Sequence, residues 1–85
     1  MNWRVFLTST AEKQFRRLPR KAAIRISQVI DEIGINPLGG DVVKLEGKGQ
    51  VWRKRIGSYR ILFEMFLEKR AVFIYEIIRR TSKTY

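Results

Sequence analysis

Residues 49–80 contain three consecutive segments that are rich in β-branched and aromatic residues. They are GQVWRKRIG, SYRILFEMF and AVFIYEIIRR, separated by a tight connection at Gly57-Ser58 and by the polar turn LEKR. Segments of this composition, joined by such short connections, are typical of antiparallel β-strands. The second half of the chain therefore predicts three antiparallel strands, and the rest of the fold must be built around them.

Two helices are predicted in the first half of the chain. A hydroxyl side chain among residues 8–10 is the candidate cap of a helix over about residues 9–18, and Pro19 closes this helix or starts the next. Apolar residues then recur at helical spacing from Arg20 to Ile33. Gly34 predicts the end of the second helix, and NPLGGD predicts a loop.

Residues 2–7 predict a strand before the helices, because their alternation places Trp3, Val5 and Leu7 on one face. The expected order is strand, helix, helix, strand, strand, strand. This order predicts an α+β fold, in which a helical hairpin covers one face of a four-stranded, mainly antiparallel sheet. With 85 residues and 45% hydrophobic content, the whole chain, residues 1–85, is expected to form a single domain around one core.

Alternation along the strands is expected to separate the side chains onto two faces of the sheet. The face toward the helices is predicted to hold Trp52, Ile56, Tyr59, Ile61, Phe63, Met65, Phe73, Tyr75 and Ile77. The open face is predicted to hold Val51, Arg53, Arg55, Arg60, Leu62, Glu64, Phe66, Ile74, Glu76, Ile78 and Arg80. Four arginines from three strands then converge at one end of a partly apolar groove.

Positive charge is unusually dense on these strands. Like charges on neighbouring strands repel, so the cluster is best explained by an anion that binds over it. The simpler alternative is an ordinary solvated sheet face. Arginine favours the first explanation, because its planar guanidinium binds phosphate through two hydrogen bonds. Glu64 and Glu76 are expected to orient the arginines through ion pairs.

The overall charge also indicates a polyanionic partner. Lys and Arg total 18 against 8 Asp and Glu, which gives a net charge of +10 and an isoelectric point near 10.7. Nucleic acid is the partner that this charge favours most, ahead of an acidic protein or an anionic membrane face. A basic surface that serves only solubility is the alternative.

The composition argues against several other classes of protein. The chain has neither cysteine nor histidine, so we expect no metal site and no cofactor. The N-terminal residues lack the pattern of a signal peptide, and no apolar run approaches the ~18 residues that cross a bilayer. A cytoplasmic protein without a membrane partner is therefore expected.

Residues 42–64, VVKLEGKGQVWRKRIGSYRILFE, combine a leucine–glycine turn, an aromatic residue before basic strand residues, and a Gly-x-Tyr-Arg step. The final EIIRRTSKTY is an arginine-rich segment that ends in tyrosine. Together with TSTAEKQFRRLPRKAAIRI, which is similar to a helical hairpin found there, these segments resemble the RelE/ParE family of toxins from bacterial toxin–antitoxin systems. The resemblance covers nearly the whole chain.

The resemblance implies a RelE-like endoribonuclease that cuts messenger RNA in the ribosomal A site and so arrests translation. The implied catalytic set is Arg53, Arg55, Arg60, Arg80 and Tyr85, with Arg79 as the alternative to Arg80. Further RNA contacts are expected at Lys44, Lys48, Lys54, Arg79 and Lys83. The implied partners are messenger RNA, the ribosome, and an acidic, partly disordered antitoxin that folds upon the basic surface.

The implied reaction transfers phosphorus from the 5′-oxygen of the following nucleotide to the adjacent 2′-hydroxyl, without a metal. Arginines suit the stabilisation of charge on the phosphorane, but their pKa, above ~12, makes them poor proton carriers. The general base therefore stays open. Tyr85 is a candidate for proton transfer or for stacking on a base. Asp41 and Glu46 lie near the place of a base carboxylate in some relatives, but we do not expect either to act as one.

Two other functions remain open from the sequence. One is a toxin of the same fold that poisons DNA gyrase and has no ribonuclease activity. Relatives of that kind generally lack the terminal tyrosine and the full set of arginines. The other is a non-catalytic module that binds nucleic acid or protein.

Overall fold

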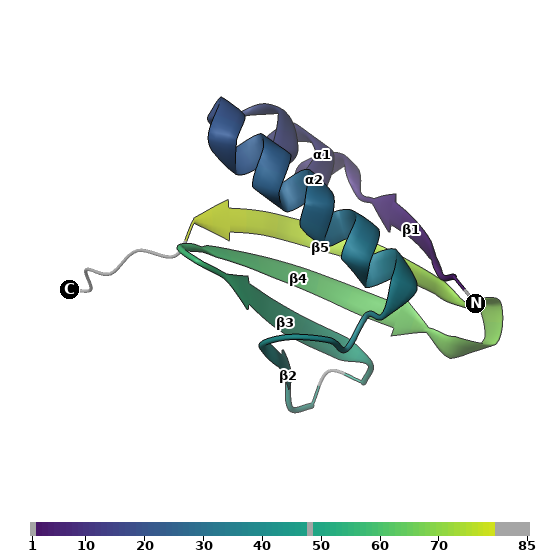
Figure 1. Ribbon diagram of the computed structural model, residues 1–85. Coiled ribbons are helices and arrows are strands. Elements are labelled where there is room, and N and C mark those ends of the chain that lie inside the picture. Colours follow the sequence, from purple (N-terminus) through teal and green to yellow (C-terminus); the bar gives the residue numbers. More distant parts are fainter. Residues whose placement is uncertain (1, 48, 80–85) are drawn as a thin grey trace.

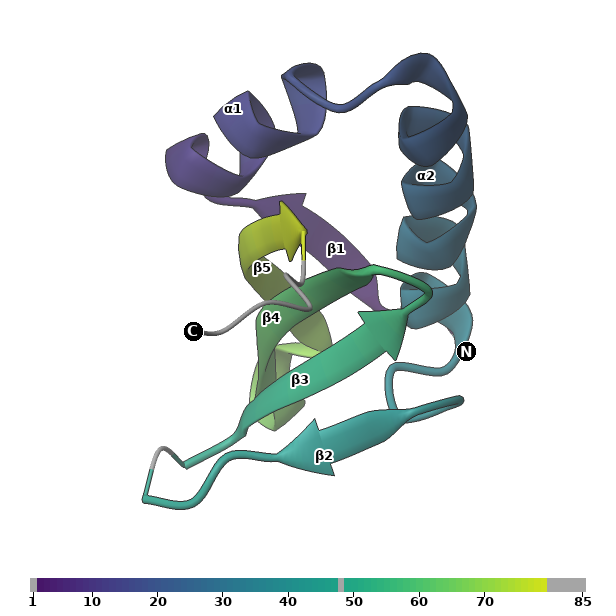
Figure 2. The same cartoon turned by 90° about the vertical axis from the view of Figure 1, so that its left-hand side faces the viewer.

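The computed structural model describes residues 2–47 and 49–79, which form a five-stranded sheet with two helices on one side (Figure 1, Figure 2). The elements in chain order are β1 (Arg4–Leu7), α1 (Ser9–Arg16), α2 (Arg20–Ile35), β2 (Val42–Lys44), β3 (Val51–Ile56), β4 (Tyr59–Phe66), the 3-10 turn η1 (Leu67–Lys69) and β5 (Ala71–Arg79). The strands lie in the order β1-β5-β4-β3-β2. The predicted α+β class is confirmed.

The sheet has five strands where the sequence predicts four. The additional strand is β2, which pairs antiparallel with β3 and places Val43 opposite Arg53. Three residues are too few to display an alternating pattern, and the glycine pair just before them indicates a loop. This is why the sequence carries no clear indication of β2, which adds an edge to the sheet beside the basic strand β3.

α1 satisfies backbone groups of β5 beyond the point where β1 ends. Thr8 Oγ1 accepts a hydrogen bond from the Ala11 N–H at 3.2 Å, which caps the helix, and donates one to the Tyr75 carbonyl at 3.3 Å. Gln14 Oε1 accepts a hydrogen bond from the Ile77 N–H at 2.7 Å. The short helix is therefore tied to the strand by polar contacts as well as by packing, as buried backbone groups require.

α2 continues through Gly34 and ends at Ile35, so the predicted helix end at Gly34 is wrong. The Trp3 N–H donates a hydrogen bond to the Gly34 carbonyl at 2.6 Å. A Cβ atom at Gly34 would meet the Trp3 carbonyl oxygen at 3.4 Å, which is an ordinary van der Waals contact. The start of the chain is therefore held against the end of α2 by a backbone hydrogen bond.

β5 contains an irregularity that changes which side chains share a face. Leu62 of β4 is opposite Glu76, but the next residue, Phe63, is opposite Ile74. Tyr75 is therefore an extra residue in β5, as in a β-bulge. An extra residue shifts the alternation of side chains by one position.

The bulge corrects the predicted faces of β5. Val72 and Ile74 are fully buried in the core, whereas the sequence predicts Ile74 on the open face. Phe73 and Tyr75 lie on the open face instead of in the core. Phe73 stacks there on Phe6 of β1, with ring centroids 5.1 Å apart. After the bulge the predicted faces are correct again, since Ile77 is buried in the core.

The core lies between the helices and the inner face of the sheet. It consists of Ala11, Ile26, Val29, Ile33, Ile56, Ile61, Phe63, Met65, Val72, Ile74 and Ile77. The predicted inward row of β4 is thus confirmed, with Ile61 and Phe63 at 0% exposure. In the part of the chain that the structure describes, neither helix is long and apolar enough to cross a membrane.

Candidate nucleic-acid interface

Three of the predicted catalytic arginines come together on the open face, beside the turn between β3 and β4. Arg53 and Arg55 are two residues apart on β3 and so share a face, and Arg60 of β4 is directly opposite Arg55. Directly opposite Cβ atoms lie about 4.5–5.5 Å apart. We call Arg53, Arg55 and Arg60 the arginine cluster. Their mutual repulsion makes this end of the face a favourable place for an anion.

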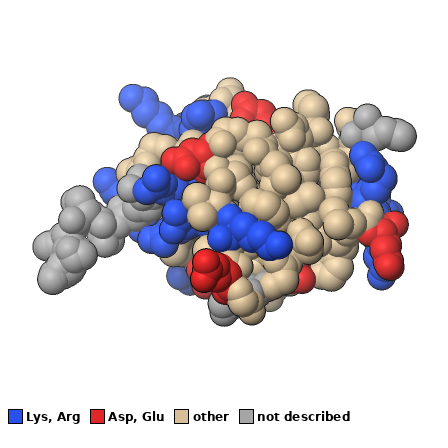
Figure 3. Space-filling view, turned by 90° about the horizontal axis from the view of Figure 1, so that it is seen from below, with Lys and Arg blue, Asp and Glu red and all other residues tan. Residues whose placement is uncertain are grey.

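Figure 3 shows how charged side chains are distributed over this side of the molecule. Lys and Arg side chains gather toward one end of the molecule in Figure 3, with acidic side chains between them. A broad uncharged region separates this group from basic residues at the opposite end. On this side of the molecule the positive charge therefore lies toward the two ends, with the larger group at one of them.

Arg55 has an acidic partner within the cluster. Its Nε donates a hydrogen bond to Asp41 Oδ2 at 3.1 Å, and its backbone N–H donates to the Asp41 carbonyl at 3.0 Å. Both side chains are about half exposed, so such a pair contributes only about 0–1 kcal/mol to stability. The main effect of Asp41 is to hold Arg55 in place and to offset part of its charge.

Arg53 and Arg60 are not neutralised in this way. Neither guanidinium pairs with an acidic residue in the described ranges 2–47 and 49–79. Only the Nε atom of each is enclosed without a hydrogen-bond partner there, so the terminal nitrogens remain accessible from the open face. These two arginines supply the uncompensated charge of the cluster.

Lys54 is separated from the cluster, because side chains alternate along β3. It is 6% exposed on the helix-facing side, and its Nζ donates a hydrogen bond to the Gly39 carbonyl at 2.8 Å. Burial lowers the pKa of Lys54, while Glu32 acts in the opposite direction. Lys54 thus anchors the loop before β2 on the face away from the arginine cluster, and this position does not support its predicted RNA contact.

Lys44 and Arg79 also lie away from the arginine cluster. Lys44 is opposite Trp52, and Arg79 is opposite Tyr59. Trp52 and Tyr59 pack against the core, so Lys44 and Arg79 belong to the helix-facing side. The Lys44 Nζ lies 5.8 Å from the centre of the Trp52 ring.

The remaining predicted site residues are Lys48, Arg80, Lys83 and Tyr85, and they lie outside the described residues. The register nevertheless bears on the choice between Arg79 and Arg80. It places Arg79 on the face opposite to Arg60. The case for Arg79 as the catalytic arginine is weakened accordingly.

Within residues 2–47 and 49–79, neither Glu64 nor Glu76 forms an ion pair with an arginine, so the prediction that these two residues orient the arginines is not supported. Among the described residues, Glu64 instead accepts a hydrogen bond from the Tyr75 hydroxyl. This bond, with a smaller effect from burial, raises the pKa of Tyr75 to about 12. The sequence could not reveal the Tyr75–Glu64 pair, because the bulge alone turns Tyr75 toward the open face.

The raised pKa of Tyr75 has a measurable consequence for stability. The ordinary pKa of tyrosine is about 10, so the protonated hydroxyl stabilises the folded state below pH ~10. This stabilisation should be lost as the pH rises from ~10 to ~12. We expect Tyr75→Phe to lack that part of the pH dependence in urea unfolding, and Tyr59→Phe to retain it. Identical pH profiles for wild type and Tyr75→Phe would show that the pair contributes nothing.

A groove adjoins the arginine cluster, where the start of α1 meets the open face of the sheet. Its volume is about 490 Å³. It is lined by Thr8, Thr10, Val51, Leu62, Tyr75 and Glu76, and we call it the side groove. Arg53 is directly opposite Leu62, so the groove is continuous with the cluster.

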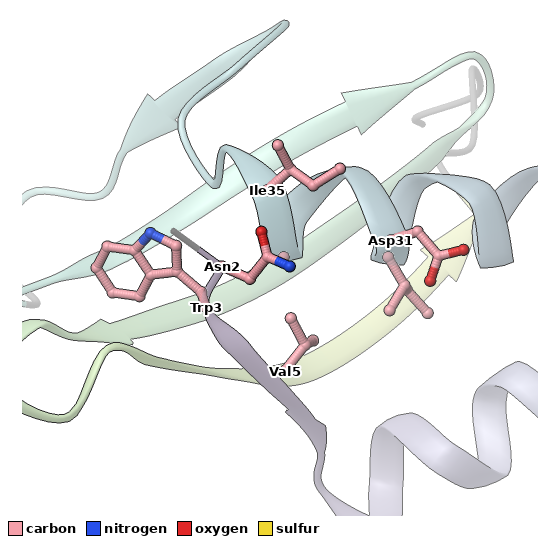
Figure 4. A pocket seen from close by; sticks show the side chains of 7 residues that line it. Asn2, Trp3, Val5, Asp31 and Ile35 are labelled. Atoms are coloured by element: carbon pink, nitrogen blue, oxygen red, sulfur yellow. The ribbon is translucent and has the colours of Figure 1, made fainter.

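Another cavity, of about 320 Å³, lies between β1 and α2 on the helix side of the sheet (Figure 4). Asn2, Trp3 and Val5 line it from the start of the chain, and Asp31 and Ile35 line it from α2 (Figure 4). The charged residue in this lining is an acid. The cavity therefore does not favour phosphate and is separate from the arginine cluster.

The chain matches the family model described as ParE toxin of the type II toxin–antitoxin system, parDE, over residues 5–83. A protein of Methanocaldococcus jannaschii that bears the name toxin RelE1 is 26% identical over 83 residues. The alignment covers 94% of this chain and 92% of the relative. The region that the family model matches, residues 5–83, includes the helices, the arginine cluster and the side groove.

Solved structures share the fold closely. The archaeal RelE–RelB complex from Pyrococcus horikoshii OT3 superposes with a TM-score of 0.85 at 26% identity, over 98% of this chain and 100% of that chain. The RelBE2 toxin–antitoxin complex from Mycobacterium tuberculosis gives a TM-score of 0.84 at 22% identity, over 94% of this chain and 100% of that chain. The arrangement of two helices on a five-stranded sheet is therefore that of these proteins.

Proposed function

This chain belongs to the RelE/ParE family of toxins from type II toxin–antitoxin systems, and we propose that it is a ribosome-dependent endoribonuclease. It cuts messenger RNA in the ribosomal A site and thereby arrests translation. The observation that supports this proposal most is the arginine cluster, in which Arg53 and Arg60 have no acidic partner among the described residues. A face built in this way suits a phosphodiester that gains negative charge during cleavage.

The cluster provides electrostatic stabilisation rather than proton transfer. Attack of the 2′-hydroxyl on phosphorus adds charge to the non-bridging oxygens, and the terminal nitrogens of Arg53 and Arg60 donate hydrogen bonds to them. Arg55, held by Asp41, adds positive potential beside them. The 2′-hydroxyl must lose a proton, and the departing 5′-oxygen must gain one. In this proposal Arg80 and Tyr85 complete the catalytic set, and Tyr85 is the candidate for proton transfer.

We further propose a cognate antitoxin as the protein partner. The similar structure from Mycobacterium tuberculosis is a toxin–antitoxin complex, RelBE2, and the one from Pyrococcus horikoshii is a RelE–RelB complex. A net charge of +10 on 85 residues favours an acidic, partly disordered partner that folds upon this surface. Such a partner would compete with RNA for the arginine cluster.

A gyrase poison without ribonuclease activity is the second candidate. The observation that favours it is the family model itself, which is described for a ParE toxin. The two candidates differ in the nucleic acid that is broken. In one case messenger RNA is cut on ribosomes, and in the other DNA is broken while RNA stays intact.

Induction of the protein in growing cells, followed by primer extension on a translated message, tests the proposal. We expect growth arrest and new 5′ ends in frame with codons, and we expect no cuts in the same message when it carries no start codon. Co-expression of the antitoxin should abolish both effects. DNA breaks with intact messenger RNA would overturn the proposal in favour of gyrase poisoning.

A further inference from the structure

The open face is arranged in rows that run across the strands. Next to the opposed pair Arg55 and Arg60 lies a row formed by Arg53 on β3, Leu62 on β4 and Glu76 on β5. Each member is directly opposite the next. A positive charge, an apolar side chain and a negative charge therefore follow one another across three strands.

The dimensions of this row suit one nucleotide. Neighbouring strands are about 4.8 Å apart, so the backbones of Arg53 and Glu76 lie about 10 Å apart, with Leu62 midway. The side groove occupies the part of the row between Leu62 and Glu76. The Tyr75 ring also lines this groove and adds a flat apolar surface.

Glu76 is the charged acceptor that remains available among the described residues lining the groove. The hydroxyl of Thr8 is engaged by the cap of α1 and by the Tyr75 carbonyl. Glu64, the neighbouring acid, is engaged by the Tyr75 hydroxyl. The Glu76 carboxylate makes no hydrogen bond or ion pair with any residue in the described ranges. Its oxygens thus remain open to a donor that enters the groove.

We propose that the side groove is a nucleobase subsite that selects bases carrying an exocyclic amino group. The nucleotide's phosphate lies on Arg53, its base packs on Leu62 and Tyr75, and its amino group donates to Glu76. Stacking on an aromatic ring tolerates any base, whereas a carboxylate discriminates among bases. Cytosine presents an N4 amino group where uracil presents the O4 oxygen, which the Glu76 carboxylate repels.

The subsite rests on the proposed function because it forms part of the proposed RNA-binding surface. Its binding of nucleotides can be tested without ribosomes. Titration of the isotope-labelled protein with cytidine 5′-monophosphate and with uridine 5′-monophosphate, followed by NMR, measures both affinities. We expect the cytidine nucleotide to bind at least about tenfold more tightly, as for a hydrogen bond to a charged group. The backbone signals of Leu62 and Glu76 should shift.

Three variants distinguish base recognition by Glu76 from a general electrostatic effect. Glu76→Gln should bring the two affinities to within about twofold of each other, because an amide offers a donor to uracil as well as an acceptor to cytosine. Arg53→Ala should weaken the binding of both nucleotides by a similar factor. Glu68→Gln removes the same charge from an exposed position in η1 and should leave the ratio at its wild-type value.

Equal affinities for the two nucleotides, or a preference that survives Glu76→Gln, would overturn the subsite. The result is independent of whether the protein cuts messenger RNA. A cytidine preference that depends on Glu76 would support the subsite even if primer extension showed no cleavage. Cleavage on ribosomes combined with equal nucleotide affinities would leave the ribonuclease proposal standing and remove the subsite.

Discussion

Replacement of Arg60 by alanine should slow messenger RNA cleavage by ~10²–10³ while leaving the protein folded. The loss of one preorganised hydrogen-bond donor to a developing oxyanion has this size of effect. Arg60 lies on the open face directly opposite Arg55, so its removal also relieves repulsion between two cations. We therefore expect the free energy of unfolding to change by no more than ~0.5 kcal/mol.

The effect of Arg60→Ala should be measured as a single-turnover rate on programmed ribosomes, together with urea unfolding. Arg20→Ala is a matched control, because Arg20 is an exposed arginine at the start of α2, on the helix side of the molecule. It removes the same charge and should leave the rate within about twofold of wild type. Full toxicity of Arg60→Ala at equal expression would show that the proposed role in the transition state is wrong.

Replacement of Phe63 by alanine should destabilise the domain by about 3–5 kcal/mol, through loss of buried surface and a residual cavity. Phe63 is fully buried on the helix-facing side of the central strand β4. Small domains have a total stability of about 5–15 kcal/mol, so the variant should lose a large part of it. Chemical unfolding followed by circular dichroism measures the loss as a lower urea midpoint.

Phe66→Ala tests whether burial causes the effect of Phe63→Ala. Phe66 lies on the same strand but on the open face, is 37% exposed, and meets Phe73 edge to face at a centroid distance of 5.3 Å. The same truncation should therefore cost clearly less there. Equal losses at Phe63 and Phe66 would contradict the assignment of Phe63 to the central core.

The arginine cluster could be predicted from the sequence, because β3 and β4 are regular and joined by a tight turn. Unbroken alternation in both strands is enough to place Arg53, Arg55 and Arg60 on one face. The same reasoning places Lys54 on the other face, where the structure shows it to be buried. A positive charge on β3 is therefore not enough to place a residue in the arginine cluster.

The side groove could not be predicted in the same way. It depends on Tyr75, which the bulge turns toward the open face, and on Thr8 and Thr10, which reach the sheet only because α1 covers β5. The helix cap at Thr8 could be foreseen, but its hydrogen bond to the Tyr75 carbonyl joins residues 67 positions apart. A pattern within one segment carries no information on such a contact.

The sequence by itself determined the α+β class, the central strands with their inward apolar row, and the basic character of one face. These properties follow from the local periodicity of side chains and from composition, which act within a few residues. Only the tertiary structure decided the edge strand β2, the bulge at Tyr75, and the passage of α2 through Gly34. Each of these depends on pairing or close approach between distant segments, where the strand register or a backbone contact outweighs local preference.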